Sequence, residues 1–273
     1  MAATPDERDA MAAVFAELCL EAGPVVMEVF SRPRIDSQVK RDDSPVTEAD
    51  ERAEALLLER LASRFPDLPV IAEESAARGE TPFQDRRFLL VDPLDGTREF
   101  LARRPEFTIN VGLVEDGEPK AGAVYAPALR QIWFGGAHAF RLVAAPGTPL
   151  APRGDWREIR ARKRPAEGLT ALVSRSHLDA ETEAFLARQN VKERTDAGSS
   201  LKFCRIAEGA ADVYPRFGPT MEWDTAAGDA VLRAAGGVVL TPEGAPLRYG
   251  KRAQDYRNGP FIAYGDATAV VPG

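Results

Sequence analysis

The sequence predicts a layered protein of the α+β or α/β class, built from two lobes at residues 1–150 and 151–273. Three observations predict it. Two helices with apolar residues at intervals of three and four open the chain, short strands follow one another, and strands and helices then alternate. We therefore expect an N-terminal antiparallel sheet with a helix pair, and a C-terminal α/β lobe.

The helix pair is marked by start and stop signals. A capping-box pattern at residues 4–7 begins the first helix, with proline in its first turn. Gly23-Pro24 is expected to end or kink this helix before residues 25–30 continue. The second helix begins near Thr47 and ends at Pro66.

Short apolar runs between turn residues predict the strands of the first lobe, at residues 70–72, 88–91, 108–114, 121–125, 132–134 and 139–143. Their close succession predicts an antiparallel meander. Residues 144–168 are rich in proline, glycine and arginine, and we expect a connector between the lobes there.

The second lobe alternates its elements. Strands are expected at residues 169–173, 211–214, 238–241 and 261–264, and helices at residues 180–189, 200–208 and 225–235. Gly236-Gly237 is expected to terminate the last of these helices. The sequence shows no internal repeat and no low-complexity segment.

Composition and charge exclude some classes of binding partner and favour one cellular location. The 273 residues carry 35 Lys and Arg against 42 Asp and Glu, a net charge of −7, which argues against a nucleic-acid duplex but allows a small anionic substrate. No run approaches ~18 apolar residues, so we expect no transmembrane helix and no membrane partner. The polar N-terminus does not resemble a signal peptide. Cys19 and Cys204 are too few for a disulfide framework, and a cytoplasmic location is expected.

The most informative segment places two carboxylates three residues apart after an apolar strand. Asp92 and Asp95 flank Pro93, which cannot continue a sheet ladder, so a turn is expected. Gly96 permits a close approach, and Thr97 can cap a new helix. Carboxylates at such a turn suit Mg²⁺. The alternative is a capping turn in which these residues have no chemical role.

Other acids strengthen the first interpretation. Glu73-Glu74-Ser75 follows a strand, so its carboxylates lie at a strand end. Asp224 precedes a helix of small residues, and taken alone it is better interpreted as a plain N-cap. Asp50 is likewise compatible with a simple capping role beside Thr47.

Three motifs now stand in order: EES at 73–75, DPLDGTREF at 92–100 and WDTAAG at 223–228. Together they resemble the lithium-sensitive, magnesium-dependent phosphatase superfamily of inositol monophosphatases, fructose bisphosphatases and 3′(2′),5′-bisphosphate nucleotidases. The resemblance extends from about residue 9 to residue 264. It implies the αβαβα sandwich of the inositol monophosphatase type, and inhibition by Li⁺.

The resemblance also implies a metal site with two or three Mg²⁺ ions. One ion would be held by Glu73, Asp92 and the backbone carbonyl of Leu94. A second would be held by Asp92, Asp95 and Asp224, with Asp92 bridging the two. Such a pair of ions suits the high barrier of phosphate monoester hydrolysis.

The same resemblance assigns the catalytic side chains. Thr97 would orient the attacking water, and Asp50 would accept its proton through Thr97. Phosphate oxygens would meet the backbone amides of Gly96 and Thr97.

The branch is suggested by residues around these motifs. Segments 97–101, 106–110 and 214–220 resemble bisphosphate nucleotidases. Arg216 stands where inositol monophosphatases place a glutamate that contacts sugar hydroxyls, and a guanidinium suits a second phosphate. The implied reaction is hydrolysis of the 3′-phosphate of 3′-phosphoadenosine 5′-phosphate to AMP and phosphate.

Four further residues are carried over as nucleotide contacts: Ser174, His177, Gly198 and Lys202. Each basic side chain also has an ordinary interpretation: a surface turn for His177, an exposed helix charge for Lys202 and a rim ion pair for Arg216. Asp229 departs from the pattern, since related bacterial nucleotidases often have histidine there, and this leaves the contacts to the base or the far phosphate open.

Two other functions stay open at this point. An inositol-1-phosphate or broad sugar phosphatase is favoured if Arg216 points away from the pocket. A non-catalytic regulator that binds metal or nucleotide is disfavoured because every expected acid and Thr97 are present. No interface stripe is visible, so both a monomer and a homodimer are compatible with the sequence.

Overall fold

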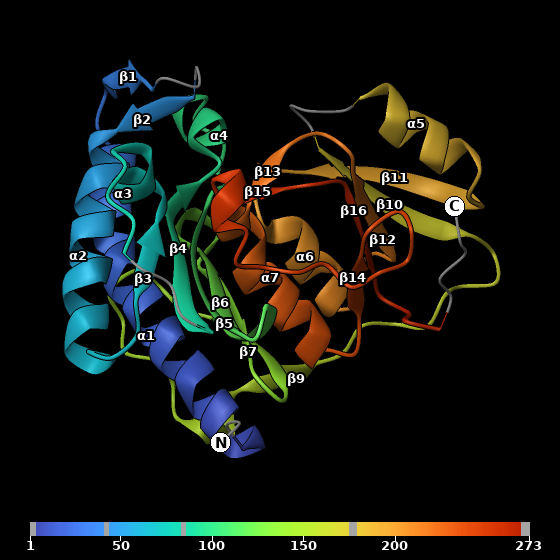
Figure 1. Ribbon diagram of the computed structural model, residues 1–273, viewed down its shortest axis with the longest axis horizontal. Helices are drawn as coiled ribbons and strands as arrows, with labels where there is room; N and C mark the ends of the chain where they lie inside the picture. The colour runs from blue at the N-terminus through green and yellow to red at the C-terminus, as the bar shows by residue number, and fades with distance from the viewer. Residues whose placement is uncertain (1–3, 41–43, 83–85, 175–178, 269–273) are drawn as a thin grey trace.

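The computed structural model describes residues 4–40, 44–82, 86–174 and 179–268. These segments form five layers, which Figure 1 shows from left to right: a helix pair, a sheet, a second helix pair, a second sheet and one outer helix. The helices of these layers are α1 (Pro5–Phe30) with α2 (Glu48–Arg64), α6 (Leu201–Ala207) with α7 (Glu222–Ala234), and α5 (Ala180–Ala187). This arrangement confirms the predicted αβαβα sandwich.

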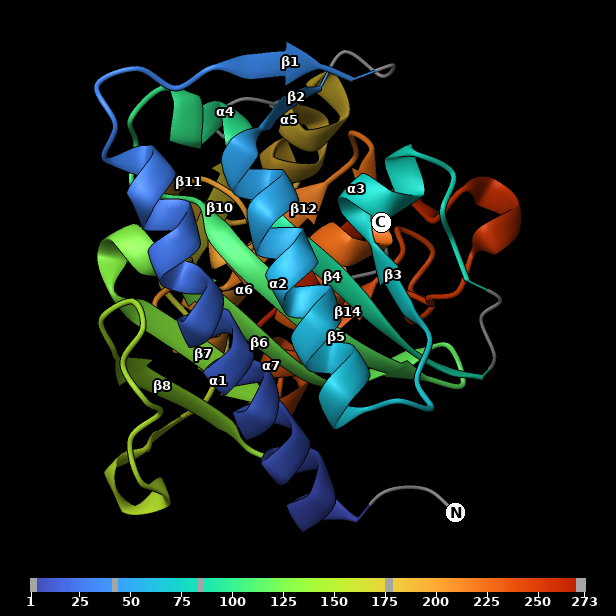
Figure 2. The same cartoon turned by 90° about the vertical axis from the view of Figure 1, so that its left-hand side faces the viewer.

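The first helix pair lies across one face of the first sheet (Figure 2). The predicted capping box of Thr4 and Glu7 is present, and α1 then continues through Pro24. Proline has no N–H to give to Leu20 one turn earlier, and the Gly147 N–H donates to that carbonyl instead, at 2.9 Å. Of the predicted end or kink at Gly23-Pro24, the end is therefore wrong, because a neighbouring loop satisfies the orphaned carbonyl.

Length and apolar composition would allow α1 to cross a membrane. In this structure 56% of its most apolar stretch is buried, and it packs against α2 and the sheet. It is the core helix of the first lobe.

The first sheet has seven strands in chain order: β3 (Val70–Ala72), β4 (Arg87–Asp95), β5 (Thr108–Glu115), β6 (Glu118–Ala126), β7 (Gln131–Gly135), β8 (Ala139–Val143) and β9 (Arg157–Ile159). Apart from the parallel pair β3–β4, neighbours run antiparallel, which confirms the meander. The strand β9 was not predicted. It lies in the polar connector and beyond residue 150, yet it pairs with β8 of the first lobe.

Strand β4 does not end before Pro93. It continues to Asp95, which pairs with Thr108, and the ladder shifts register between Asp92 and Asp95. The predicted turn at Pro93 is thus a bulge within the strand, where a missing N–H is tolerated. The bulge places both carboxylates at the same end of the sheet.

Helix α7 lies unusually close to the first sheet, against β5 and β6. A Cβ atom on Gly122 would lie 2.7 Å from the Ala227 carbonyl oxygen, and one on Gly112 would lie 2.9 Å from the Ala227 nitrogen. The small residues of the WDTAAG motif and these two glycines therefore let helix and sheet touch through their backbones. This contact brings the start of α7, with Asp224, to the end of β4.

The second sheet has five strands in the order β11 (Val191–Ala197), β10 (Leu169–Ser174), β12 (Val213–Arg216), β16 (Phe261–Tyr264) and β14 (Val238–Leu240). Strand β10 runs parallel to β11 and β12, and β16 runs antiparallel to both of its neighbours. The remaining elements are short: β1 (Ser37–Val39) with β2 (Pro45–Thr47), β13 (Thr220–Met221) with β15 (Arg257–Asn258), α3 (Glu73–Ala77), α4 (Thr97–Leu101), and 3₁₀ turns at Pro127–Leu129, Arg153–Asp155 and Arg252–Gln254.

The predicted strands and helices of the second lobe are all present, with shifted ends. Strand β11 was missed, because five of its seven residues are exposed and polar and give no apolar pattern. Helix α7 begins at Glu222 rather than Thr225, so Asp224 lies in its first turn and is not the N-cap.

Candidate active site

A cavity lies between the two lobes, at the end of β4 and beside the starts of α4, α6 and α7. Its lining includes most of the predicted site residues: Glu73, Asp95, Gly96, Thr97, Ser174, Gly198, Lys202, Arg216 and Asp224. The lining also includes residues that sequence reasoning did not single out: Ser199, Ser200, Tyr214 and Thr225.

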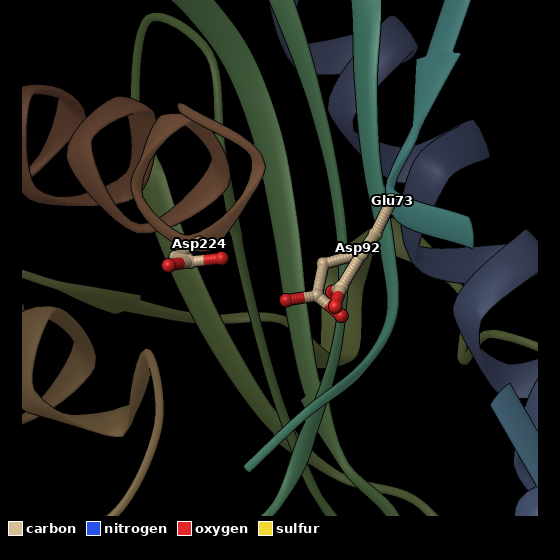
Figure 3. Close-up of side chains that lie close together, drawn as sticks. All are labelled: Glu73, Asp92 and Asp224. Atoms are coloured by element: carbon tan, nitrogen blue, oxygen red, sulfur yellow. The ribbon is translucent and has the colours of Figure 1, made fainter. Parts of the chain in front are cut away.

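Three carboxylates meet beside this cavity, and we call Glu73, Asp92 and Asp224 the acid cluster. One oxygen of each lies within 4.8 Å of the others. Glu73 opens α3 directly after β3, Asp92 lies on β4, and Asp224 lies in the first turn of α7. Figure 3 shows Asp224 facing Asp92 from the helix side, with Glu73 beside Asp92.

The carboxylates of the acid cluster are buried and repel one another, so a bound cation would stabilise them. Burial raises the pKa of Asp92 well above its ordinary value, and the carboxylates of Glu73, Asp95 and Asp224 raise it further. Burial raises the pKa of Asp224 in the same way, with Asp95 and Glu73 contributing. An all-oxygen set of mutually repelling carboxylates is the donor set that hard divalent cations prefer, so these residues fit the metal that the motifs imply.

Lys40 contacts the acid cluster directly, and sequence reasoning missed it. The Lys40 Nζ donates to Glu73 Oε1 and to Glu74 Oε1, each at 2.6 Å. Burial disfavours the ammonium, but the two carboxylates outweigh it and raise the pKa of Lys40. Burial, followed by the charge of Glu73, raises the pKa of Glu74 to about 7. Lys40 comes from the β1–β2 hairpin, whose pairing leaves no helical or apolar pattern in the sequence.

Asp95 lies outside the acid cluster as defined and is held from the second lobe. Its Oδ2 accepts from the Ser200 N–H and is 2.6 Å from Ser200 Oγ, and Asn110 Nδ2 donates to the same hydroxyl oxygen at 2.8 Å. Ser200 Oγ is also 2.7 Å from the Asp224 carbonyl. The start of α6 thus fixes Asp95 relative to α7. Burial is the main cause that raises the pKa of Asp95.

Thr97 and Asp50 meet as the motifs implied. Thr97 Oγ1 lies 3.3 Å from Asp50 Oδ1 and 3.3 Å from the Leu94 carbonyl. Asp50 Oδ2 also accepts from the Thr47 N–H at 2.8 Å and from its hydroxyl at 2.6 Å. Asp50 is therefore both the capping partner of Thr47 and the neighbour of Thr97. Burial raises the pKa of Asp50 to about 6.

The turn before α4 corrects one detail. The N-cap is Gly96, in the left-handed region at φ +93°, and Thr97 is the first helical residue. The prediction that Thr97 caps the helix is wrong, because its hydroxyl faces Asp50 and Leu94 instead. Gly96 is needed for this backbone conformation.

Lys202 and Arg216, two of the three basic candidates, are buried at the cavity. Lys202 is 4% exposed, and its Nζ donates to the carbonyls of Ser199 (2.7 Å) and Ala197 (3.1 Å), 5.1 Å from the ring centre of Tyr214. Burial lowers the pKa of Lys202 to about 8. The interpretation of Lys202 as an exposed helix charge is wrong.

Arg216 is 7% exposed, which also excludes an exposed rim charge. Its Nε donates to the Gly218 carbonyl at 3.2 Å and its Nη2 to the Pro219 carbonyl at 3.0 Å. These carbonyls hold the guanidinium in place while Arg216 lines the cavity.

Of the remaining candidates, some line the cavity and others do not. Ser174 and Gly198 line the cavity, and a Cβ atom on Gly198 would lie 2.6 Å from the Glu106 carbonyl oxygen, so that glycine also allows the lobes to touch. His177 lies outside the described residues. Asp229 is fully buried in α7, where it accepts from Arg233 Nε at 2.6 Å and from the Tyr249 hydroxyl at 3.0 Å. Asp229 is absent from the described cavity lining.

With this geometry in view, comparison with known proteins decides the family. The family model described as the inositol monophosphatase family matches residues 7–268. The chain belongs to this family. It is a phosphatase of a family that uses divalent metal ions and acts on small phosphate substrates, and the non-catalytic interpretation falls away.

Individual relatives agree with this assignment. The chain is 42% identical to a Salmonella typhimurium protein named 3′(2′),5′-bisphosphate nucleotidase CysQ. The match extends over 238 residues, which are 86% of this chain and 92% of that protein. The crystal structure of CysQ from Bacteroides thetaiotaomicron matches with a TM-score of 0.78 and 35% identity, covering 94% of this chain and 97% of that one. An inositol monophosphatase from Anabaena has the same fold, with a TM-score of 0.72, 24% identity, and 96% and 97% of the two chains covered.

Proposed function

We propose that this phosphatase removes the 3′-phosphate from 3′-phosphoadenosine 5′-phosphate, giving AMP and phosphate, with Mg²⁺ as its metal. The observation that carries the proposal is the pair of buried cations, Lys202 and Arg216, in the cavity that Glu73 and Asp224 of the acid cluster also line. A substrate with two phosphates needs a cationic pocket beside the metal site, whereas a polyol does not. The names of relatives such as the Salmonella protein support the same substrate class.

The metal ligands in this proposal are those that the motifs imply. Glu73, Asp92 and the Leu94 carbonyl would hold one ion, and Asp92, Asp95 and Asp224 a second. When bound, Mg²⁺ lowers the pKa of water and stabilises the negative charge that develops on the transferred phosphoryl group. The bulge in β4 and the backbone contact between α7 and the sheet keep these oxygens together.

Thr97 and Asp50 handle the proton in this proposal. The Thr97 hydroxyl accepts a hydrogen bond from the attacking water and donates its own proton toward Asp50 Oδ1. With a pKa of about 6, Asp50 is ionised at neutral pH yet basic enough to take a proton, which is the compromise that general-base catalysis favours. The backbone amides at Gly96 and Thr97 would bind the phosphate oxygens.

The remaining phosphate would pair with Lys202 and Arg216, and Ser174 and Gly198 would contact the nucleotide. His177 remains a predicted contact. An inositol or sugar phosphatase would gain nothing from Arg216, and that alternative was favoured if Arg216 pointed away from the cavity, whereas Arg216 lines it. We also propose a cytoplasmic setting, which the two free, buried cysteines suit.

The test is a substrate panel under Mg²⁺ that compares phosphate release from 3′-phosphoadenosine 5′-phosphate, inositol 1-phosphate and fructose bisphosphate. We expect a clear preference for the nucleotide, and a preference for inositol phosphate would reject the proposal. The variant Arg216→Glu should weaken bisphosphate binding more than monophosphate binding. The exposed Arg188, in the same lobe, serves as a control, and Arg188→Glu should leave both unchanged.

A further inference from the structure

Ser75, the last residue of the first motif, has no role in the proposed chemistry. Ser75 follows the acids Glu73 and Glu74, but it is absent from the acid cluster and from the described cavity lining. Its hydroxyl donates to Glu54 Oε1 at 2.7 Å, across 21 positions of sequence. The motif is therefore connected to a carboxylate on α2.

Glu54 makes a complete set of contacts with the start of α3. Its Oε2 accepts from the Glu74 N–H at 2.7 Å, and its Oε1 accepts from the Ser75 N–H at 2.8 Å. The residue before α3, Ala72, gives no side-chain cap. Glu54 thus caps α3 from another helix. It accepts hydrogen bonds from backbone amides that have no partner within α3.

Burial makes this contact specific. The Glu54 side chain is 3% exposed, and Arg78, the nearest cation among its described ion pairs, lies 3.5 Å away with a half-exposed side chain. A buried carboxylate is costly unless its oxygens are hydrogen-bonded, and here three donors from α3 supply those bonds. A movement of α3 would break all three bonds together.

The position of Glu54 on α2 links two parts of the site. Asp50 lies four residues earlier, one turn away on the same face, and it contacts Thr97. Glu54 contacts the helix that Glu73 opens. One turn of α2 therefore contacts both the Thr97 hydroxyl and the helix that begins with Glu73.

We propose that Glu54 is a positioning residue of the metal site, which fixes Glu73 through the cap on α3 and through Ser75. This inference rests on the proposed function, since it assumes that Glu73 is a metal ligand. Residues that orient metal ligands from behind commonly change metal affinity ten- to a hundredfold. A cap with a merely structural role would change stability without changing metal affinity.

The experiment measures binding of Mn²⁺ alone to the full chain, by calorimetry, for wild type, Glu54→Gln and Glu51→Gln. Glu51 lies on the same helix with an exposed side chain and is the matched control. The amide of Glu54→Gln keeps the size but turns a donor toward one α3 amide. We expect Mn²⁺ affinity to fall about tenfold or more, the KM for Mg²⁺ to rise in parallel, and kcat at saturating Mg²⁺ to stay within about threefold. Glu51→Gln should match wild type.

A folded Glu54→Gln variant that binds Mn²⁺ as tightly as wild type would overturn the inference and leave the proposed function standing. If wild type itself binds no Mn²⁺, the proposed function fails first, so the two failures are distinct. Should Glu54→Gln not fold, Ser75→Ala decides, because it removes one donor and keeps the carboxylate. A roughly threefold or larger loss of Mn²⁺ affinity supports the inference, and wild-type affinity contradicts it.

Discussion

Replacement of Asp92 by asparagine should stabilise the metal-free protein while abolishing its response to metal. Asp92 is 1% exposed and lies in the acid cluster with Glu73 and Asp224. Because its pKa is raised, this carboxyl group lowers the stability of the fold at pH values above its ordinary pKa, and the cost is complete once the folded protein ionises it. Asparagine removes the charge and keeps an Oδ1 atom that accepts the Leu94 N–H bond, now 3.0 Å long.

The size of the gain can be bounded. Two unit charges at the 4.8 Å that limits the cluster repel by about 3.5 kcal/mol at an effective dielectric constant of about 20. The repulsion has a ceiling, because at about pH 7.5 a carboxylate with an ordinary pKa can take up a proton for about 5 kcal/mol. A gain of about 1–5 kcal/mol is therefore expected. For a chain of this length, about 1 kcal/mol raises the melting temperature by about 2 °C.

The assay is thermal unfolding of wild type and Asp92→Asn, each in excess EDTA and in excess Mg²⁺. The variant should melt at least about 2 °C above wild type in EDTA. Wild type should gain stability when Mg²⁺ is added and the variant should not, so the order reverses. Asp229→Asn is the control: it is a buried acid on α7 that pairs with Arg233, and its loss should destabilise by about 3–5 kcal/mol in both buffers.

The reasoning is refuted if Asp92→Asn is less stable than wild type in EDTA and still gains stability from Mg²⁺. That result would mean that the carboxylates do not repel one another and that the cation binds elsewhere.

Three further predictions follow from single contacts. Thr97→Ala should lower kcat by about a hundredfold and Thr97→Ser by far less, since serine keeps the hydroxyl; equal losses in steady-state assays would count against proton transfer through it. In EDTA, the free energy of unfolding measured with urea should fall as the pH rises from about 5 to 7.5. The reason is that the folded protein raises the pKa of Asp50 to about 6 and that of Glu74 to about 7, so ionising them costs stability. A free energy of unfolding that rises over this range would contradict the prediction. Gly122→Ala should destabilise by about 1–3 kcal/mol or more in urea, and Gly154→Ala, which meets nothing within 4 Å, by far less.

Much of the fold follows from local pattern. Apolar periodicity and caps locate α1, α2 and the meander, because those elements bury one face against a core. The missed elements lack that signal. Strand β11 is an exposed edge strand of polar residues, and β9 lies in a connector rich in arginine. Pro24 is tolerated within α1 only because Gly147, far along the chain, replaces the lost donor.

The site residues likewise fall into those that a local sequence pattern predicted and those that it did not. The acids that meet the cavity were found because each follows a strand or opens a helix, in motifs whose order is characteristic. Their supporting partners were not: Lys40, Glu54 and Ser200 contact residues 20 to 105 positions away, and nothing local marks them. Long-range pairs of this kind are decided by tertiary packing, which a single sequence does not display.

The most direct test of the account is a crystal of the protein soaked in Mn²⁺, with the anomalous signal of manganese measured at the end of β4. The account predicts strong peaks about 2.2 Å from oxygens of Glu73, Asp92 and Asp224, and their loss in the Asp92→Asn variant. Peaks confined to other acidic surfaces, with these three carboxylates unliganded, would contradict it.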